Sequence, residues 1–242
     1  MGIGTKLGIF GLSGASFSNT YSIAFDGSDD YIDCGDNDNL SFGDGSTDSA
    51  FSISSWVKFD TTGTSMNIVS KYLTYPNGEY YLAKLTDGTI LFRIISQNNE
   101  LNRRGRITNS IDSLVGQWVH VVATYSGNSD YTGIKIYVNG VSSDVANNGK
   151  NTYVAMSNTT NPLKIGLAFS GNIDETAIFN SELSASDALA IYNSGTPLSL
   201  DDYSPVGWWR FEEGSGTTAT DSGTGGNDGT LTNGPTYDSD VP

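Results

Sequence analysis

The sequence predicts an all-β protein, a sandwich of two antiparallel sheets with one short helix. Three observations lead to this prediction. Short stretches rich in β-branched and aromatic residues recur along the chain, separated by clusters of Gly, Asn and Asp. Only 6 of the 27 acidic residues are Glu, so the acidic residues favour turns over helices. A chain of 242 residues is long enough to bury one substantial core.

Alternation and turn dipeptides place the strands. In "AFSISSWVKF", Phe51, Ile53 and Val57 share one face of a strand, while Trp56 lies on the other. We expect hairpin turns at residues 87–88 (Asp-Gly) and 139–140 (Asn-Gly), because these dipeptides adopt the positive φ angles that tight hairpins require. The stretch "WVHVVATY" is apolar on both faces, as is typical of a central strand covered on both sides.

One helix is expected in "LSASDALAIYNSG". Ser184 is placed to cap its N-terminus, and Asp187 complements the helix dipole. Leu189 and Tyr192 supply an apolar stripe, and Gly195 ends the helix.

Charge and cysteine content exclude several classes of protein. The formal net charge of −15 opposes binding to nucleic acid and to anionic membranes. No apolar stretch reaches the length of a membrane span. Cys34 is the only cysteine, so no internal disulfide is expected, and we interpret it as a packing residue. Glycines interrupt the apolar N-terminal stretch, so we expect no cleaved signal peptide.

Several segments carry a family likeness in their order and spacing. They read "YSIAFDGSDDYIDCGD", "FSISSWVKF", "QWVHVVATYSG", "IKIYVNG", "LKIG" and "FSGNIDETAIFNSELSASDALAIYNSG". From Tyr21 to about Gly195 the chain resembles a LamG-type domain of the concanavalin A-like lectin/glucanase superfamily. The resemblance implies a jelly roll of two curved antiparallel sheets, one concave and one convex.

The segment "VGWWRFEEGSGTTATDSGTGGNDGTLTNGP" resembles the part of this family that ordinarily precedes "FDGSDDYI". Three interpretations are open. The segment is a truncated second domain, or it supplies the missing strands of the same sandwich in circularly permuted order. In the third interpretation it donates strands to a neighbouring copy. About 38 residues cannot bury a core of their own. We favour closure within the chain, because sandwich termini often lie close together. Residues 21–242 then form one jelly roll, which residues 205–242 complete.

Residues 1–20 are expected to form an extended N-terminal arm. Glycines disfavour a helix there, yet the segment contains six large apolar residues, which are Ile3, Leu7, Ile9, Phe10, Leu12 and Phe17. We expect the arm to anchor the protein in an assembly by lying across a neighbouring subunit.

The sequence predicts no catalysis. Glucanases of this superfamily carry two glutamates in a Glu-x-Asp-x-x-Glu strand, and none of the six glutamates here has that spacing. A single histidine, His120, gives no support for a zinc site or a Ser-His-Asp triad. Trp56 and His120 are candidates for binding a ligand on the concave face. The alternative is that both pack in the interior.

Calcium is the one cofactor that the resemblance implies. Relatives often hold a structural Ca²⁺ between the loop that corresponds to "FDGSDD" and an Asp of the "IDE" strand. Carried over to this sequence, the ligands are Asp26, Gly27 and Asp174. The alternative, which stays open, is that the first two residues only form a turn and Asp174 only caps backbone amides. The basic cluster at residues 103–106 is interpreted as a solvated loop, or as a contact with an acidic partner subunit.

Permuted domains that end in such a "GWWR" segment also resemble structural proteins of marine tailed phages. The predicted function is therefore that of a non-enzymatic virion protein, a capsid decoration or tail appendage subunit. Its expected partners are other virion proteins, copies of itself and host-surface glycans. A secreted bacterial carbohydrate-binding or adhesive module is the alternative.

Overall fold

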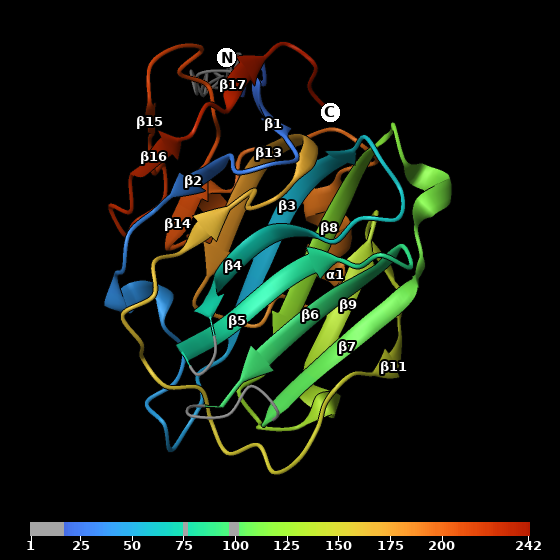
Figure 1. Ribbon diagram of the computed structural model, residues 1–242, viewed down its shortest axis with the longest axis vertical. Coiled ribbons are helices and arrows are strands. Elements are labelled where there is room, and N and C mark those ends of the chain that lie inside the picture. The colour runs from blue at the N-terminus through green and yellow to red at the C-terminus, as the bar shows by residue number, and fades with distance from the viewer. Residues whose placement is uncertain (1–16, 75–76, 97–101) are drawn as a thin grey trace, which may run out of the picture.

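The computed structural model describes residues 17–74, 77–96 and 102–242, so residues 1–16 of the predicted arm lie outside it. The described chain forms two antiparallel sheets of eight and nine strands (Figure 1). The predicted all-β sandwich with one short α-helix is confirmed in this part of the chain. No helix among the described residues has the length and apolar character needed to cross a membrane.

The eight-stranded sheet, called the back sheet, lies behind the other in Figure 1. Its strands, in spatial order, are β10 (Val141–Ser142), β9 (Ile134–Val138), β8 (Trp118–Tyr125), β3 (Phe51–Phe59), β13 (Ser170–Phe179), β1 (Ser22–Asp26) and β17 (Thr236–Asp238). A further strand, β14 (Gly207–Trp209), also pairs with β13.

The nine-stranded sheet, called the front sheet, faces the viewer in Figure 1. Its strands, in spatial order, are β11 (Asp144–Asn147), β7 (Arg103–Ser110), β6 (Thr89–Ile95), β5 (Asn77–Lys84), β4 (Met66–Thr74), β12 (Lys164–Ile165), β2 (Tyr31–Asp33), β16 (Gly229–Thr232) and β15 (Thr218–Ala219). Four short 3-10 helices lie in the connections, at Asp38–Leu40, Asp112–Leu114, Tyr131–Gly133 and Asp201–Tyr203.

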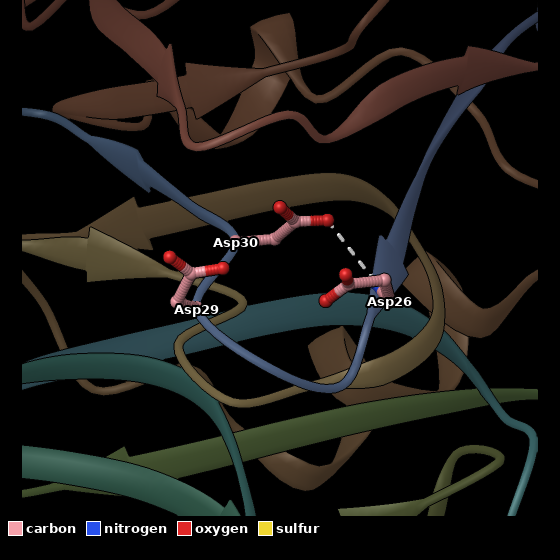
Figure 2. Close-up of side chains that lie close together, drawn as sticks. All are labelled: Asp26, Asp29 and Asp30. Carbon is pink, nitrogen blue, oxygen red and sulfur yellow. Dashed lines mark hydrogen bonds between the residues drawn. The ribbon is translucent and has the colours of Figure 1, made fainter.

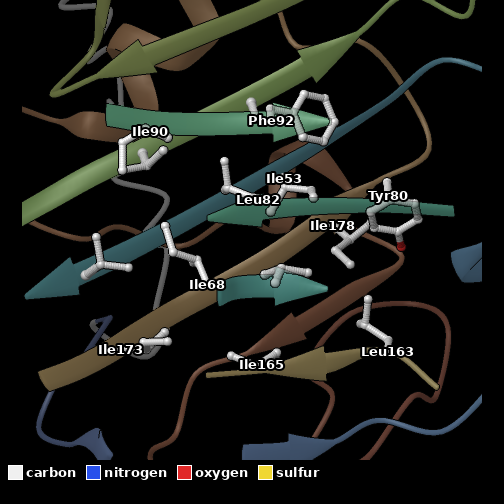
Figure 3. Close-up of a cluster of buried hydrophobic side chains, with 14 of the residues drawn as sticks. Ile53, Ile68, Tyr80, Leu82, Ile90, Phe92, Leu163, Ile165, Ile173 and Ile178 are labelled. Carbon is white, nitrogen blue, oxygen red and sulfur yellow. The ribbon is translucent and has the colours of Figure 1, made fainter. Parts of the chain in front are cut away.

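The main core lies between the two sheets. Figure 3 shows Ile53 and Ile178 of the back sheet together with Leu82 and Phe92 of the front sheet. The alternation predicted for β3 is confirmed, because Ile53 lies in this core while Trp56 does not. The strand β8 is buried along almost its whole length, as its two apolar faces predict.

Both predicted hairpins are present. Asn139 and Gly140 have φ angles of 51° and 74°, and they connect β9 to β10 in the register Val138↔Val141. Residues 87–88 connect β5 to β6, with Gly88 at a φ of 81°.

The C-terminal segment pairs with strands of both sheets. β17 pairs with β1, β16 pairs with β2, and β14 pairs with β13. β1 therefore lies between β13 and β17, and β2 lies between β12 and β16. The segment takes up positions inside the sandwich and has no separate core.

The helix α1 (Ala185–Tyr192) covers part of the outer face of the back sheet. Ser184 and Asp187 form a reciprocal capping box, which confirms the predicted N-terminus. The predicted apolar stripe is wrong at Leu189, which is 57% exposed, because Ala188 and Ile191 are the residues that turn toward the sheet. The helix also ends before Gly195, since Asn193 adopts the left-handed cap conformation.

Candidate functional site

Trp56 and His120 do not form a ligand site in this structure. They lie opposite each other on β3 and β8, with ring centroids 4.8 Å apart, and Tyr192 of α1 stacks over Trp56. Trp56 is 3% exposed and His120 is fully buried. Burial lowers the pKa of His120 to about 3, so the imidazole is neutral and bonds to the Ser54 hydroxyl at 2.8 Å. Both residues pack under α1, which contradicts the prediction that they bind a ligand.

The loop between β1 and β2 gathers three carboxylates. One oxygen each of Asp26, Asp29 and Asp30 lies within 4.8 Å of the others (Figure 2). Asp30 accepts a hydrogen bond from the Asp26 amide at 3.1 Å, and Gly27 turns the chain with a φ of 84°. Burial, with the neighbouring aspartates, raises the pKa of Asp30. Such oxygen ligands suit a hard cation such as Ca²⁺.

Asp174 lies outside this cluster. The prediction that Asp26, Gly27 and Asp174 bind one calcium ion together is therefore wrong. In the antiparallel register of β1 and β13, Asp26 lies opposite Ser170. Asp174 is four residues further along β13, roughly 13 Å away at about 3.3 Å per residue. It is fully buried and bonds to the side chain of Asn19 instead. Asp26 and Gly27 remain candidates, together with Asp29 and Asp30, which the family resemblance does not imply.

A groove of about 310 Å³ opens on the outer face of the front sheet, across β4 and β5. We call it the front groove, and it is lined by Ser65, Asn67, Ser70, Tyr72, Tyr81, Ala83, Leu85 and Leu167. The rings of Tyr72 and Tyr81 lie 5.7 Å apart and are tilted by 40°. Both tyrosines are partly exposed, and polar side chains lie beside them. The front groove therefore combines an aromatic surface with hydrogen-bonding groups.

Local sequence explains how the two tyrosines reach this face. In "EYYLAKL", Tyr80 and Leu82 point into the core, so the intervening Tyr81 points outward. Gly78 lies opposite Tyr72 in the register, and an added Cβ at Gly78 would come within 2.0 Å of the Tyr72 ring. The absence of a side chain at this glycine makes room for the ring. The alternation within β5 is visible in the sequence and separates Tyr81 from Tyr80.

Arg93 of β6 holds the outer side of Tyr81. Its guanidinium lies over the Tyr81 ring at 5.3 Å and donates to the phenol oxygen of Tyr81. The same guanidinium donates to the side-chain oxygen of Asn148. A cation over an aromatic face is attracted by the ring quadrupole, so Arg93 fixes the orientation of Tyr81 at the groove.

The basic cluster at residues 103–106 lies on β7, so its interpretation as a loop is wrong. Arg104 lies over the ring of Tyr131 at 4.9 Å, and Arg106 donates to Asp144 of β11 at 2.9 Å. Both guanidinium groups hold the edge of the front sheet together.

Among the residues that the structure describes, two glutamates are buried, and both have several partners. Glu79 accepts from Lys71 at 3.0 Å and from the amide of Thr159 at 2.9 Å. Glu175 accepts from Nε1 of Trp208 at 2.6 Å and from Arg210 at 3.2 Å. Burial raises the pKa of both carboxyls, that of Glu175 to about 7.

Two antiparallel sheets stacked on each other, with one short helix on the outer face of the back sheet, define a jelly-roll sandwich. Residues 26–188 match the family described as the concanavalin A-like lectin/glucanases superfamily. The chain belongs to this superfamily.

Comparison with solved structures finds similar chains at low sequence identity, and the first of the two described here has the same fold. A proposed carbohydrate binding protein from Bacteroides ovatus is similar with a TM-score of 0.62 and 18% identity, over 93% of this chain and 62% of its own. The binding domain of botulinum neurotoxin serotype D gives a TM-score of 0.47 and 18% identity, over 61% of this chain and 37% of its own. This chain thus spans less than two thirds of either structure. No curated protein gives a significant match to the sequence.

Proposed function

We propose that this protein is a non-enzymatic, glycan-binding domain that binds its ligand in the front groove. The observation that carries the proposal is the pair Tyr72 and Tyr81, held partly exposed beside Asn67 and Ser70. A sugar ring has an apolar face that packs on aromatic rings, and hydroxyl groups that bond to amides and hydroxyls. The B. ovatus protein supports the proposal by analogy of fold.

The positions of the buried glutamates support the proposal that the domain is non-enzymatic. Glu79 and Glu175 belong to different sheets, and each is bonded to a cation of its own. Hydrolysis of a glycosidic bond by the common route uses two carboxyl groups on either side of the bond. Neither Glu79 nor Glu175 lines the front groove.

The test compares two tyrosine variants on one sheet. Tyr81→Ala removes half of the aromatic surface of the groove. Tyr31→Ala is the matched control, because Tyr31 lies on β2 of the same sheet, outside the groove, with Lys164 over its ring at 3.7 Å. A glycan array followed by calorimetric titration should show binding that Tyr81→Ala abolishes and Tyr31→Ala retains. Equal binding by both variants would place the ligand elsewhere.

We propose a virion as the biological setting, with this chain as a capsid decoration or tail appendage subunit. Support comes from the resemblance of its "GWWR" segment to phage structural proteins, and from an N-terminal segment rich in apolar residues. Its partners in this setting are other virion proteins, copies of the chain and host-surface glycans. The likeness to the B. ovatus protein favours the alternative, a secreted carbohydrate-binding module. Mass spectrometry of purified particles separates the two, because only the first requires the chain to be present in them.

A further inference from the structure

A second hollow, of about 540 Å³, opens at the rim of the sandwich beside the front groove. It lies where the loop between β3 and β4, the turn between β5 and β6 and residues 168–170 come together. Asp26 and Gly27, at the end of β1, also line it. We call it the rim hollow, and segments from both sheets contribute to its walls.

The rim hollow and the front groove are continuous. Ser65 lines both of them. At three places the chain passes directly from the wall of one to the wall of the other, and these places are residues 65–67, 85–86 and 167–168. The two hollows therefore form one trough, which we call the extended groove.

Hydrogen bonds fix the junction between the two parts. The backbone amide and the side-chain amide of Asn67 both donate to the carbonyl of Leu167, at 3.2 and 3.4 Å. The amide of Asp60 donates to the carbonyl of Ser170 at 3.0 Å. The wall formed by residues 167–170 is thus bonded both to β4 and to the end of β3, so the fold sets the shape of the junction.

The extended groove is longer than a single sugar ring. Tyr72 lines the front groove and Met66 lines the rim hollow, and both lie on β4. Six residues separate them along this strand, which corresponds to roughly 20 Å at about 3.3 Å per residue. A trough of this length suits a chain of linked sugars better than one terminal sugar.

The rim hollow is rich in hydroxyl groups. Thr61 and Thr64 bond to each other at 3.1 Å. The hydroxyls of Ser65, Thr86 and Ser170 have no partner within the part of the chain that the structure describes. A hydroxyl both donates and accepts, so these three groups are available to pair with the hydroxyls of a sugar.

The charges around the extended groove favour an uncharged ligand. In the described ranges no lysine or arginine lines either hollow, whereas Asp26 lines one of them. Arg93, which lies over the Tyr81 ring, is already bonded to Tyr81 and to Asn148. The chain as a whole has a net charge of −15. A carboxylate or sulfate on a sugar would meet like charge here without a cation to pair with it.

We propose that the ligand is a chain of several uncharged sugars, which lies along the extended groove from the two tyrosines into the rim hollow. This inference rests on the proposed function, because it requires that the front groove binds a glycan. Tyr72 and Tyr81 hold one sugar by its apolar face. The free hydroxyls of the rim hollow bond to sugars further along the chain, so affinity depends on the length of the glycan.

Calorimetric titration with cello-, manno- and xylo-oligosaccharides of two to six sugars tests this dependence. The titrations contain EGTA, so that calcium at Asp26 takes no part. In the series that binds, affinity should rise by about tenfold from the dimer to the hexamer, as two hydrogen bonds of typical net strength would produce. Thr64→Trp places an indole in the rim hollow and should abolish this gain while leaving affinity for the dimer unchanged.

Thr62→Trp is the matched control and should keep the gain, because Thr62 is an exposed residue of the same loop that lines neither hollow. Thr86→Ala/Ser170→Ala is a second variant, which removes two of the free hydroxyls without adding bulk and should reduce the gain. It decides the outcome if Thr64→Trp does not fold.

Equal affinity for the dimer and the hexamer in the unaltered protein overturns the proposal. A gain that persists in both altered proteins also overturns it. Oligogalacturonates of the same lengths test the charge, and binding as tight as that of the uncharged series would show that the ligand need not be uncharged.

Tyr81→Ala separates this inference from the proposed function. Loss of dimer binding in Tyr81→Ala supports the front groove as a glycan site, whether or not affinity depends on length. Dimer binding that Tyr81→Ala retains contradicts the proposed function. Absence of binding by every series overturns both proposals.

Discussion

Trp208 and Trp209 are neighbours on β14, but they pack into different cores. Trp208 lies on the outer face of the back sheet, and its Nε1 donates to Glu175 at 2.6 Å. Trp209 is fully buried between the sheets, and its Nε1 donates to the carbonyl of Asn227 at 2.8 Å. The C-terminal segment is therefore tied into the protein on both sides of the back sheet.

Trp209→Ala is expected to lower the free energy of unfolding by about 3–5 kcal/mol, because it leaves a large cavity in the main core. Urea denaturation followed by circular dichroism measures the change. Trp118→Ala, at a partly exposed tryptophan, is the control and should cost less. Deletion of residues 205–242 should abolish cooperative unfolding altogether. A truncated chain that still unfolds cooperatively would contradict the structural role of this segment.

Calcium is expected to bind at the turn of Asp26, Asp29 and Asp30. A ligand that binds only the folded state stabilises it by about 2.7 kcal/mol at a hundred times its Kd. Titration with Ca²⁺ should raise Tm, and EGTA should reverse the rise. Asp30→Asn should remove this response, and Asp174→Asn should retain it. The opposite result would restore the ligand set that the family resemblance implies.

His120 makes stability depend on pH in the acidic range. Burial lowers the pKa of His120 from 6.5 to about 3, so below pH 6.5 the unfolded chain binds a proton that the folded chain does not. The contribution to stability is complete above 6.5 and is lost as the pH falls toward 3. Glu175 acts in the opposite direction between about 4.5 and 7, because its pKa is raised. A variant that lacks the histidine is therefore needed to separate the effects of His120 and Glu175 on stability.

The difference in unfolding free energy between the unaltered protein and His120→Gln isolates the contribution of His120. The contributions of all other titratable groups are the same in both proteins and cancel in the difference. From pH 8 to pH 4.5 this difference should shift by about 2.7 kcal/mol in favour of the variant. Guanidinium denaturation at a series of pH values measures it. A difference that stays constant with pH would mean that the imidazole is hydrated in the folded state.

Lys71 is expected to be essential for stability. Its Nζ is fully buried and bonds to Asp36 at 2.7 Å, to the carbonyl of Asn161 at 2.8 Å and to Glu79 at 3.0 Å. Lys71→Ala should cost about 3–5 kcal/mol, because it leaves the buried Glu79 without its cation. Lys164→Ala, at a partly exposed lysine, is the control and should cost less than about 1 kcal/mol. Recovery of stability in Lys71→Met/Glu79→Gln would identify the unpaired charge as the cause.

Local patterns in the sequence were sufficient to predict much of the fold. The alternation in β3, the turn at residues 139–140 and the cap at Ser184 each depend on neighbouring residues only, and the structure contains all three. The apolar stripe of α1 was mispredicted at Leu189, since which side of a short helix is buried depends on where it docks.

The candidate site depended on contacts between distant segments, and there the sequence was less informative. Whether Trp56 and His120 reach solvent depends on the docking of α1, which no pattern in β3 or β8 records. The separation of Asp26 from Asp174 is set by the register of β1 against β13, and the sequence alone does not fix that register. The outward position of Tyr81 was readable from the alternation of β5, whereas its stacking with Arg93 of β6 was not.

The pairing of β1 with β17 also determines how the protein responds to mechanical force. Ser22 lies opposite Asp238, so β1 begins and β17 ends at the same end of one antiparallel pair. Tension applied between these ends loads the hydrogen bonds of the pair one after another, as in opening a zipper. We therefore expect the C-terminal strand to peel away at low force while the rest of the sandwich remains folded.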